Sequence, residues 1–203
     1  MMASQMTKKD RIYRGSPGAE RASQRRAQLV AAGMKRFGSA GYQEVSVRAV
    51  CVEAGLTERY FYESFENREE LLGAVYLTAI ASLDAAVQAA IVEGASVEAR
   101  TRAGLNAYFG FMKRHPAVAR VILFEVLGVN GAIDGMYREV MSQFARLLSE
   151  RLELGKARLL ASGLVGAAVH IAMQWVLGGY QQRQRTVVDS CVRIFLAVAE
   201  PRP

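Results

Sequence analysis

The sequence predicts an all-α fold, in which an N-terminal helix-turn-helix head of three helices precedes a larger helical core, about nine helices in all. Apolar residues recur along most of the chain at the three- and four-residue spacing of amphipathic helices. Residues 25–72 divide into short helical stretches joined by tight turns, which is typical of a helix-turn-helix. No segment shows the alternating pattern of a β-strand.

The first expected elements are a flexible basic arm and an amphipathic helix. Residues 1–18 form the arm, with Lys8, Lys9, Arg11 and Arg14 ahead of a Ser-Pro-Gly run. A helix over residues 19–38 follows, because its apolar positions share one face: Leu29, Val30, Gly33, Met34 and Phe37. The run Gly-Ser-Ala-Gly over residues 38–41 ends this helix.

Two short helices come next. Ser46 is expected to cap the second helix, and Gly55 with Leu56 makes the turn after it. The buried face of this second helix is expected to hold Val47, Val50, Cys51 and Ala54. Thr57 is expected to cap the third helix, in which Phe61 and Phe65 share the core-facing side.

A longer fourth helix is expected to begin near Arg68, because Asn67 and Glu70 have the spacing of a capping box. It continues to about residue 90. Further helices are predicted over residues 97–114, 116–128, 132–153, 156–180 and 186–199, separated by glycine, proline and polar breaks. Residues 159–182 carry no formal charge, and we interpret this segment as a buried helix of a soluble oligomer rather than a membrane span.

The charge of the chain favours a polyanionic partner. The formal net charge is +7 over 203 residues. Residues 1–68 hold 12 Lys and Arg against 7 Asp and Glu, so this third of the chain contributes 12 − 7 = +5. The N-terminal residues lack the apolar core that a signal peptide contains. Cys51 and Cys191 are expected to be buried, reduced thiols. We therefore expect a cytoplasmic protein.

A set of spaced residues in the head, in register over about 48 residues, carries a family resemblance: Phe37, Gly41, Tyr42, Ser46, Val47, Ala54, Gly55, Leu56, Thr57, Phe61, Tyr62, Phe65, Arg68, Glu69, Glu70, Leu71 and Leu72. With these residues the head resembles the tetracycline-repressor (TetR) family of bacterial transcription regulators. It implies a DNA-binding domain over residues 19–66 and an effector-binding and dimerisation domain over residues 67–203. It also implies a homodimer on a partly palindromic operator, released by a small lipophilic effector of unknown identity.

Six residues are the candidates for DNA contact. The resemblance assigns Tyr62 and Arg68 to the DNA backbone, while Arg48 and the Thr57 hydroxyl are placed to reach phosphates. Arg59 and Tyr60 depart from the small residues usual in the family and are the candidates for base reading. The basic arm is either a disordered tail or a clamp on phosphates or the minor groove.

The candidate effector pocket is drawn from aromatic and methionine side chains of the later helices. Its predicted residues are Tyr108, Phe109, Met112, Phe124, Glu125, Met136, Tyr137, Met141, Met173 and Trp175. Glu125 lies in an apolar stretch and needs a partner, for which we favour an internal arginine over a cationic effector. The dimer interface is expected at the small residues Gly163, Gly166 and Ala167.

Catalysis is not expected. Neither His115 nor His170 has a nucleophile or acid at a recognisable spacing, and His170 reads as a core histidine. We expect no cofactor and no metal. Two alternatives remain, an effector-independent DNA binder or activator and a helical ligand-binding protein without DNA binding; Arg59, Tyr62 and Arg68 argue against the second.

Overall fold

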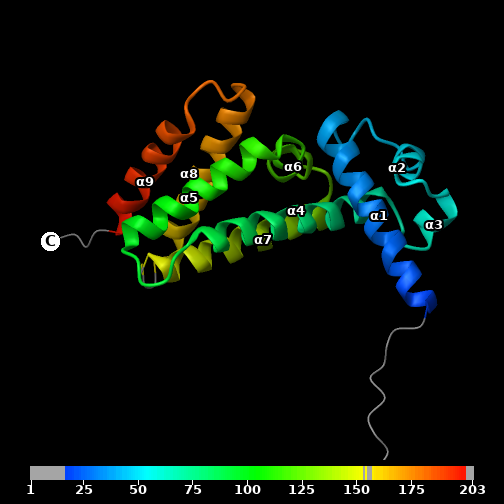
Figure 1. The fold of residues 1–203 in the computed structure, drawn as a ribbon, viewed down its shortest axis with the longest axis horizontal. Helices are drawn as coiled ribbons and strands as arrows, with labels where there is room; N and C mark the ends of the chain where they lie inside the picture. The colour runs from blue at the N-terminus through cyan, green and yellow to red at the C-terminus, as the bar shows by residue number, and fades with distance from the viewer. Residues whose placement is uncertain (1–16, 153, 155–156, 200–203) are drawn as a thin grey trace, which may run out of the picture.

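The computed structural model describes residues 17–152, 154 and 157–199, and within these residues every regular element is a helix. Figure 1 shows the elements in their order along the chain. They are α1 (Pro17–Ala40), α2 (Val47–Ala54), α3 (Glu58–Tyr62), α4 (Arg68–Ala90), α5 (Val97–Arg114), α6 (Pro116–Arg120), the π-turn η1 (Val121–Glu125), α7 (Gly131–Arg151), α8 (Arg158–Leu177) and α9 (Gln184–Ala199). The predicted all-α fold is confirmed. Residues 1–16 of the predicted basic arm lie outside the described residues.

The molecule has a head at one end and a helical core that extends away from it (Figure 1). Helices α1, α2 and α3 make up the head, and α4 leads from the head into the core. In the core, α5 packs against α4 and α9, while α7 packs against α8. The C-terminal end of α1 packs on α6, so that the head also meets the core through this short helix.

Side-chain caps set the starts of several helices, as the sequence predicts for two of them. The Ser46 hydroxyl accepts a hydrogen bond from the Ala49 amide at 3.2 Å. The Asn67 side chain accepts one from the Glu70 amide at 2.8 Å. Thr57 has the extended backbone of an N-cap residue, but its hydroxyl makes no capping hydrogen bond, so the capping bond predicted for it is absent.

Two apolar clusters hold the fold together, and α4 belongs to both. The head cluster contains the predicted core residues Phe37, Val50, Phe61 and Phe65, and it continues into α4 through residues 71–76. Side chains from beyond α4 complete the head cluster: Val121, Val126, Ile133 and Val140. The core cluster begins at Ala79 and Leu83 of the same helix. Since apolar burial is the main stabilising term, α4 ties the stability of the head to that of the core.

The helix expected over residues 116–128 is divided in the structure. α6 ends at Arg120, the next five residues form the π-turn η1, and Gly128 has a left-handed backbone with φ of 69°. η1 lies where the two apolar clusters meet: Val121 belongs to the head cluster, whereas Ile122 and Leu123 belong to the core cluster. A π-turn widens the helix locally and is frequent at functional positions.

Two helices, α4 and α8, are long and apolar enough to cross a membrane by length and composition. α4 lies between the two apolar clusters described above. α8 packs on α7 with one side and leaves the other exposed, since Leu159 and Leu177 are 89% and 69% exposed. The interpretation of this segment as a helix buried in an oligomer stays a prediction, because the single chain leaves this side of α8 uncovered. His170, interpreted as a core histidine, also lies on the exposed side of α8.

Candidate DNA interface and ligand cavity

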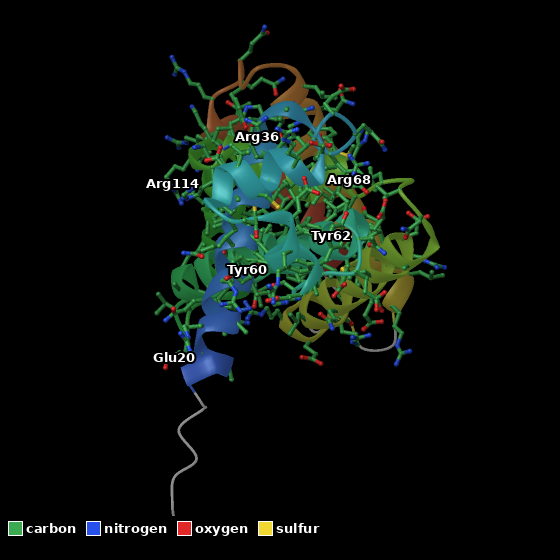
Figure 2. All side chains as sticks on the ribbon, turned by 90° about the vertical axis from the view of Figure 1, so that its right-hand side faces the viewer. Glu20, Arg36, Tyr60, Tyr62, Arg68 and Arg114 are labelled. Atoms are coloured by element: carbon green, nitrogen blue, oxygen red, sulfur yellow. The ribbon has the colours of Figure 1, made fainter. Side chains whose placement is uncertain are left out.

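The head presents a short third helix whose outer side is open to solvent. Gly55 adopts a left-handed conformation with φ of 66°, and this allows the chain to turn directly from α2 toward α3. Phe61 is buried on the inner side of α3, and Phe65, three residues after the end of this helix, is buried as well. As a consequence Arg59 and Tyr62 project outward, with the Arg59 side chain 84% exposed and Tyr62 58% exposed. Figure 2 faces this end of the molecule, with α2 and α3 in front.

A cluster of charged and aromatic side chains fixes the outer face of α3 to α1. Arg59 Nε lies 3.0 Å from Glu63 Oε1, and Arg25 of α1 reaches the other carboxylate oxygen of Glu63 at 3.6 Å. The Arg25 guanidinium also stacks over the Tyr60 ring, 4.5 Å from its centroid. Tyr60 is therefore half-buried against α1, whereas Arg59 stays in solvent. Arg25 was not among the predicted site residues.

Arg68 has partners within the protein. Its Nη1 donates to the carbonyl oxygens of Val45, Tyr42 and Gln43 at 2.7, 3.3 and 3.4 Å, and its guanidinium lies over the Tyr42 ring at 4.4 Å. The Tyr42 hydroxyl in turn donates to Glu69 at 2.7 Å. Arg68 thereby fastens the loop before α2 to the start of α4.

This packing changes the acidity of both partners of the Tyr42–Glu69 hydrogen bond. Burial, followed by the hydrogen bond to Glu69, raises the pKa of Tyr42 from 10.0 to about 12. The same hydrogen bond, which stabilises the carboxylate, lowers the pKa of Glu69 below its usual value.

The two remaining candidates for DNA contact, Arg48 and Thr57, are exposed. Arg48 lies on α2, and Thr57 lies directly before α3 with its hydroxyl free of a capping bond. The structure thus brings five of the predicted residues, Arg48, Thr57, Arg59, Tyr60 and Tyr62, to α2 and α3. Arg68 sits at the start of α4, bound to the neighbouring loop.

The core contains a mostly apolar cavity of about 180 Å³ between α4, α5, α7 and α8. Its apolar wall is formed by residues that include Ile80, Leu83, Val87, Ile91, Leu105, Ile122, Phe144, Leu148, Leu152, Val165, Val169 and Phe195. A few polar side chains line it as well: Asp84, Gln88, Arg100, Thr101 and Arg151. Deep, largely apolar cavities with a few polar groups are typical sites for small molecules.

Of the ten predicted pocket residues, only Tyr108 and Met141 line this cavity. Phe109, Met112 and Trp175 are instead buried in the packed core, where the Phe109 and Trp175 rings meet edge to face at 5.8 Å. The others lie outside the cavity wall: Phe124, Glu125, Met136, Tyr137 and Met173. Phe109 and Trp175 thus fill the core, whereas the aromatic residues that line the cavity are Tyr108, Phe144 and Phe195.

The cavity wall could have been found from α4. Ile80, Leu83, Val87 and Ile91 form a helical stripe, and Asp84 with Gln88 interrupt it at the same spacing. Asp84 is half-buried and Gln88 is exposed, and both line the cavity beside this stripe. The predicted pocket does not include the stripe, because the prediction rested on aromatic and methionine side chains.

Glu125 has the internal arginine partner that we favoured. Its Oε1 lies 2.7 Å from Arg120 Nε, and its Oε2 accepts a hydrogen bond from the Tyr42 amide at 2.5 Å. Arg120 also donates to the Ser39 carbonyl oxygen at 3.2 Å. We name the group Arg120, Glu125 and the Tyr42 amide the junction latch, because it joins η1 of the core to the end of α1 in the head.

Close backbone packing lies beside the junction latch. A side chain at Gly38 would place its Cβ 2.5 Å from the Ala117 carbonyl oxygen, so only glycine lets α1 approach α6 this closely. The backbones of α1 and α6 are thus in direct contact beside the junction latch.

The residues predicted for the dimer interface lie on α8. Gly163 and Gly166 are exposed, with open space around both, and Ala167 is half-buried. Large apolar side chains are exposed near them along α8 and on α9: Leu159, Leu160, Leu177 and Ile194. An exposed apolar face of this kind is typical of an interaction surface.

Comparison with known proteins points to one family. The family model described as "Bacterial regulatory proteins, tetR family" matches residues 29–75, which extend from α1 to the first part of α4. The HTH-type transcriptional activator FasR of Mycolicibacterium smegmatis is 26% identical over 162 residues, which cover 75% of this chain and 73% of FasR.

Solved structures share the fold. The fatty acid degradation regulator FadR from Bacillus halodurans matches with a TM-score of 0.74 at 19% identity, covering 85% of this chain and 94% of that one. FadR from Bacillus subtilis in complex with stearoyl-CoA matches with a TM-score of 0.75 at 16% identity, covering 85% and 98%. The fold, the helix-turn-helix residues and the family match agree with the resemblance stated above: residues 29–75 match the tetR family of bacterial regulatory proteins, and this match supports DNA binding and transcription regulation.

Proposed function

We propose that the chain is a cytoplasmic, homodimeric repressor that binds a partly palindromic operator and releases it when a long-chain acyl ligand fills the core cavity. The apolar wall of the cavity supports a lipophilic ligand. The acyl class is suggested by the two FadR structures, one of them described with stearoyl-CoA. A dimer would present two α3 helices to half-sites about 34–36 Å apart.

The observation that carries the proposal is the position of α4. Its first half packs into the head cluster through Leu71, Leu72 and Val75. Its second half supplies Ile80, Leu83 and further residues of the cavity wall. Because one rigid helix serves both sites, a ligand that separates the cavity walls tilts α4 and changes the distance between the two recognition helices of a dimer.

η1 supplies a second connection. Ile122 lines the cavity, and Glu125, three residues later in the same turn, belongs to the junction latch with the Tyr42 amide. A ligand that displaces Ile122 pulls on the loop that precedes α2. Binding energy is transmitted in this way only if the ligand binds the released state more tightly than the DNA-bound state.

In the head, we assign base reading to Arg59 and Tyr60, and phosphate contact to Arg48, Thr57 and Tyr62. The exposure of Arg59 and Tyr62 supports these assignments. For Arg68 we propose a positioning role in the same interface, because its Nη1 already binds the loop before α2.

Fluorescence anisotropy with fragments of the promoter near its own gene tests the proposal. Binding is expected to weaken steeply as salt rises, because phosphate contacts release counterions. Octadecanoic acid or octadecanoyl-CoA is expected to lower operator affinity about 5- to 150-fold. Salt-independent or absent binding to every fragment would exclude the DNA-binding role, and release by neither ligand would exclude the acyl effector.

A second candidate is a transcriptional activator, and the name of the relative FasR favours it. Both candidates bind DNA through the same residues and differ only in the effect on transcription. A promoter reporter with and without the gene separates them, since loss of a repressor raises the signal and loss of an activator lowers it.

A further inference from the structure

Two arginines line the core cavity at its end away from the head. Helix order defines this end, because α4 runs from the head toward Ile91, α5 starts beyond it, and α7 finishes there. Arg100 belongs to the first turn of α5 and Arg151 is the last residue of α7. Both are half-buried and both belong to the cavity wall.

Neither guanidinium is neutralised by a carboxylate in the described part of the chain. Arg100 Nη1 donates to the Ala95 carbonyl oxygen at 2.9 Å, and Arg151 donates to the side-chain oxygen of Gln88. The Gln88 amide donates at 3.0 Å to Asp84, the acid in the cavity wall. Asp84 is thus joined to Arg151 through an amide, and none of the ion pairs between described residues contains Arg100 or Arg151.

The opposite end of the cavity has a different character. Tyr108, Ile122, Met141 and Phe144 form the wall nearest to the head, and none of them carries a charge. The cavity therefore changes along its length from two half-buried cations to an apolar end beside η1. A half-buried guanidinium beside an apolar space is stabilised by an anion, which supplies the charge and the hydrogen-bond acceptors that it lacks.

We infer that the cavity binds a long-chain anion in one orientation, with its anionic group at Arg100 and Arg151 and its hydrocarbon chain directed toward Ile122. This inference rests on the proposed function, to which it adds the charge of the ligand and its direction. The anionic oxygens can belong to the carboxylate of a free acid or to the phosphates of a coenzyme A thioester. In either case the end of the chain meets η1, the turn that holds the junction latch.

Ligands that differ only in the head group test the inference. Isothermal titration calorimetry on the full chain would compare dodecanoic acid, dodecanoyl-CoA and 1-dodecanol, for the wild type and for Arg100→Gln, Arg151→Gln and the double variant. Glutamine keeps hydrogen-bond donors and removes the charge. Arg102→Gln and Arg146→Gln are matched controls, because these arginines lie on the same two helices but outside the cavity wall.

The wild type is expected to bind an anionic ligand more tightly than the alcohol. Each cavity substitution should lower the affinity for the anionic ligand about tenfold, which corresponds to about 1.4 kcal/mol, because it removes a charge-assisted hydrogen bond. Affinity for 1-dodecanol should change less than about twofold, and the control variants should bind all three ligands as the wild type does. If the cavity variants lose affinity for dodecanoic acid, the carboxylate is the group that the arginines bind. If they lose affinity for dodecanoyl-CoA alone, the arginines bind its phosphates.

Two results would overturn the inference and leave the proposed function standing. In one, the wild type binds the alcohol as tightly as the anions; in the other, the cavity variants lose the same affinity for all three ligands. Failure of the wild type to bind any of the three chains would contradict the inference and the acyl effector of the proposed function, whereas operator binding in the anisotropy experiment tests the DNA-binding role separately. Thermal unfolding of each variant, expected to match the wild type, excludes misfolding as the cause of a loss.

Discussion

At the residue scale, Arg59 is a highly exposed member of the proposed DNA contacts, with 84% of its side chain open to solvent. Its pairing with Glu63 is solvent-exposed and contributes little to stability, so its removal should leave the fold intact. Arg59→Ala is expected to weaken operator binding by about 1–3 kcal/mol and to relax the preference at one base pair. Anisotropy on an operator and its single-base variants measures both.

The controls for this prediction lie in the same chain. Tyr62→Phe, which removes a proposed phosphate contact, should weaken all operator variants about equally. Arg185→Ala removes an exposed arginine of α9 and should have no effect on either quantity. Unchanged base preference in Arg59→Ala would show that another residue reads the operator.

Tyr42 makes the stability of the head depend on alkaline pH. The unfolded chain loses the Tyr42 proton near pH 10, whereas the folded chain keeps it until about pH 12. Between these values the unfolded state binds fewer protons, so the free energy of unfolding falls as the pH rises. Urea unfolding should give a lower free energy of unfolding at about pH 11 than at about pH 9. Tyr42→Phe should reduce this difference between the two pH values, while Tyr62→Phe, at an exposed position, should not.

At the element scale, the junction latch is expected to carry part of the coupling between ligand and DNA. Glu125→Gln keeps the volume but removes the charge that holds Arg120 and the Tyr42 amide. It should lower the free energy of unfolding by about 1.5–3 kcal/mol. It should also reduce the ratio of operator dissociation constants measured with and without octadecanoyl-CoA.

A matched control distinguishes the junction latch from a general loss of stability. Glu53→Gln breaks the ion pair with Lys35, which joins α1 to α2 inside the head at 2.5 Å and does not contact the core. This variant should keep the wild-type ratio of operator dissociation constants measured with and without octadecanoyl-CoA. If Glu125→Gln also keeps this ratio, the coupling between ligand and DNA depends on α4 alone.

Sequence reasoning predicted the helices well because their ends carry local chemistry. Ser46 and Asn67 cap helices through bonds within three residues, and Gly55 needs only its own backbone to form the turn. η1 could not be predicted, because its surroundings are two apolar clusters assembled from distant parts of the chain, and no glycine or proline within it marks a change of helix geometry. Nor could the role of Arg68, whose carbonyl partners lie 23 or more residues away in the chain.

At the scale of the whole molecule, the exposed apolar face of α8 and α9 predicts self-association. Light scattering should give a mass of about twice 22.2 kDa. Ile194→Glu or Gly166→Glu places a charge on this face and should yield the monomer mass together with weaker operator binding. Val92→Glu is the control, since Val92 is an apolar residue that is 69% exposed in the turn after α4. A monomeric wild type would contradict the proposed dimer.

The head cluster has a consequence for recombination between members of this family. Val121, Val126, Ile133 and Val140 come from beyond α4, yet they complete the apolar interior of the head. A chimaera that exchanges only the segment before α4 would therefore join two half-cores that had never been selected to fit each other. A new DNA-binding specificity should transfer more reliably by exchanging the exposed residues of α2 and α3 than by exchanging the domain.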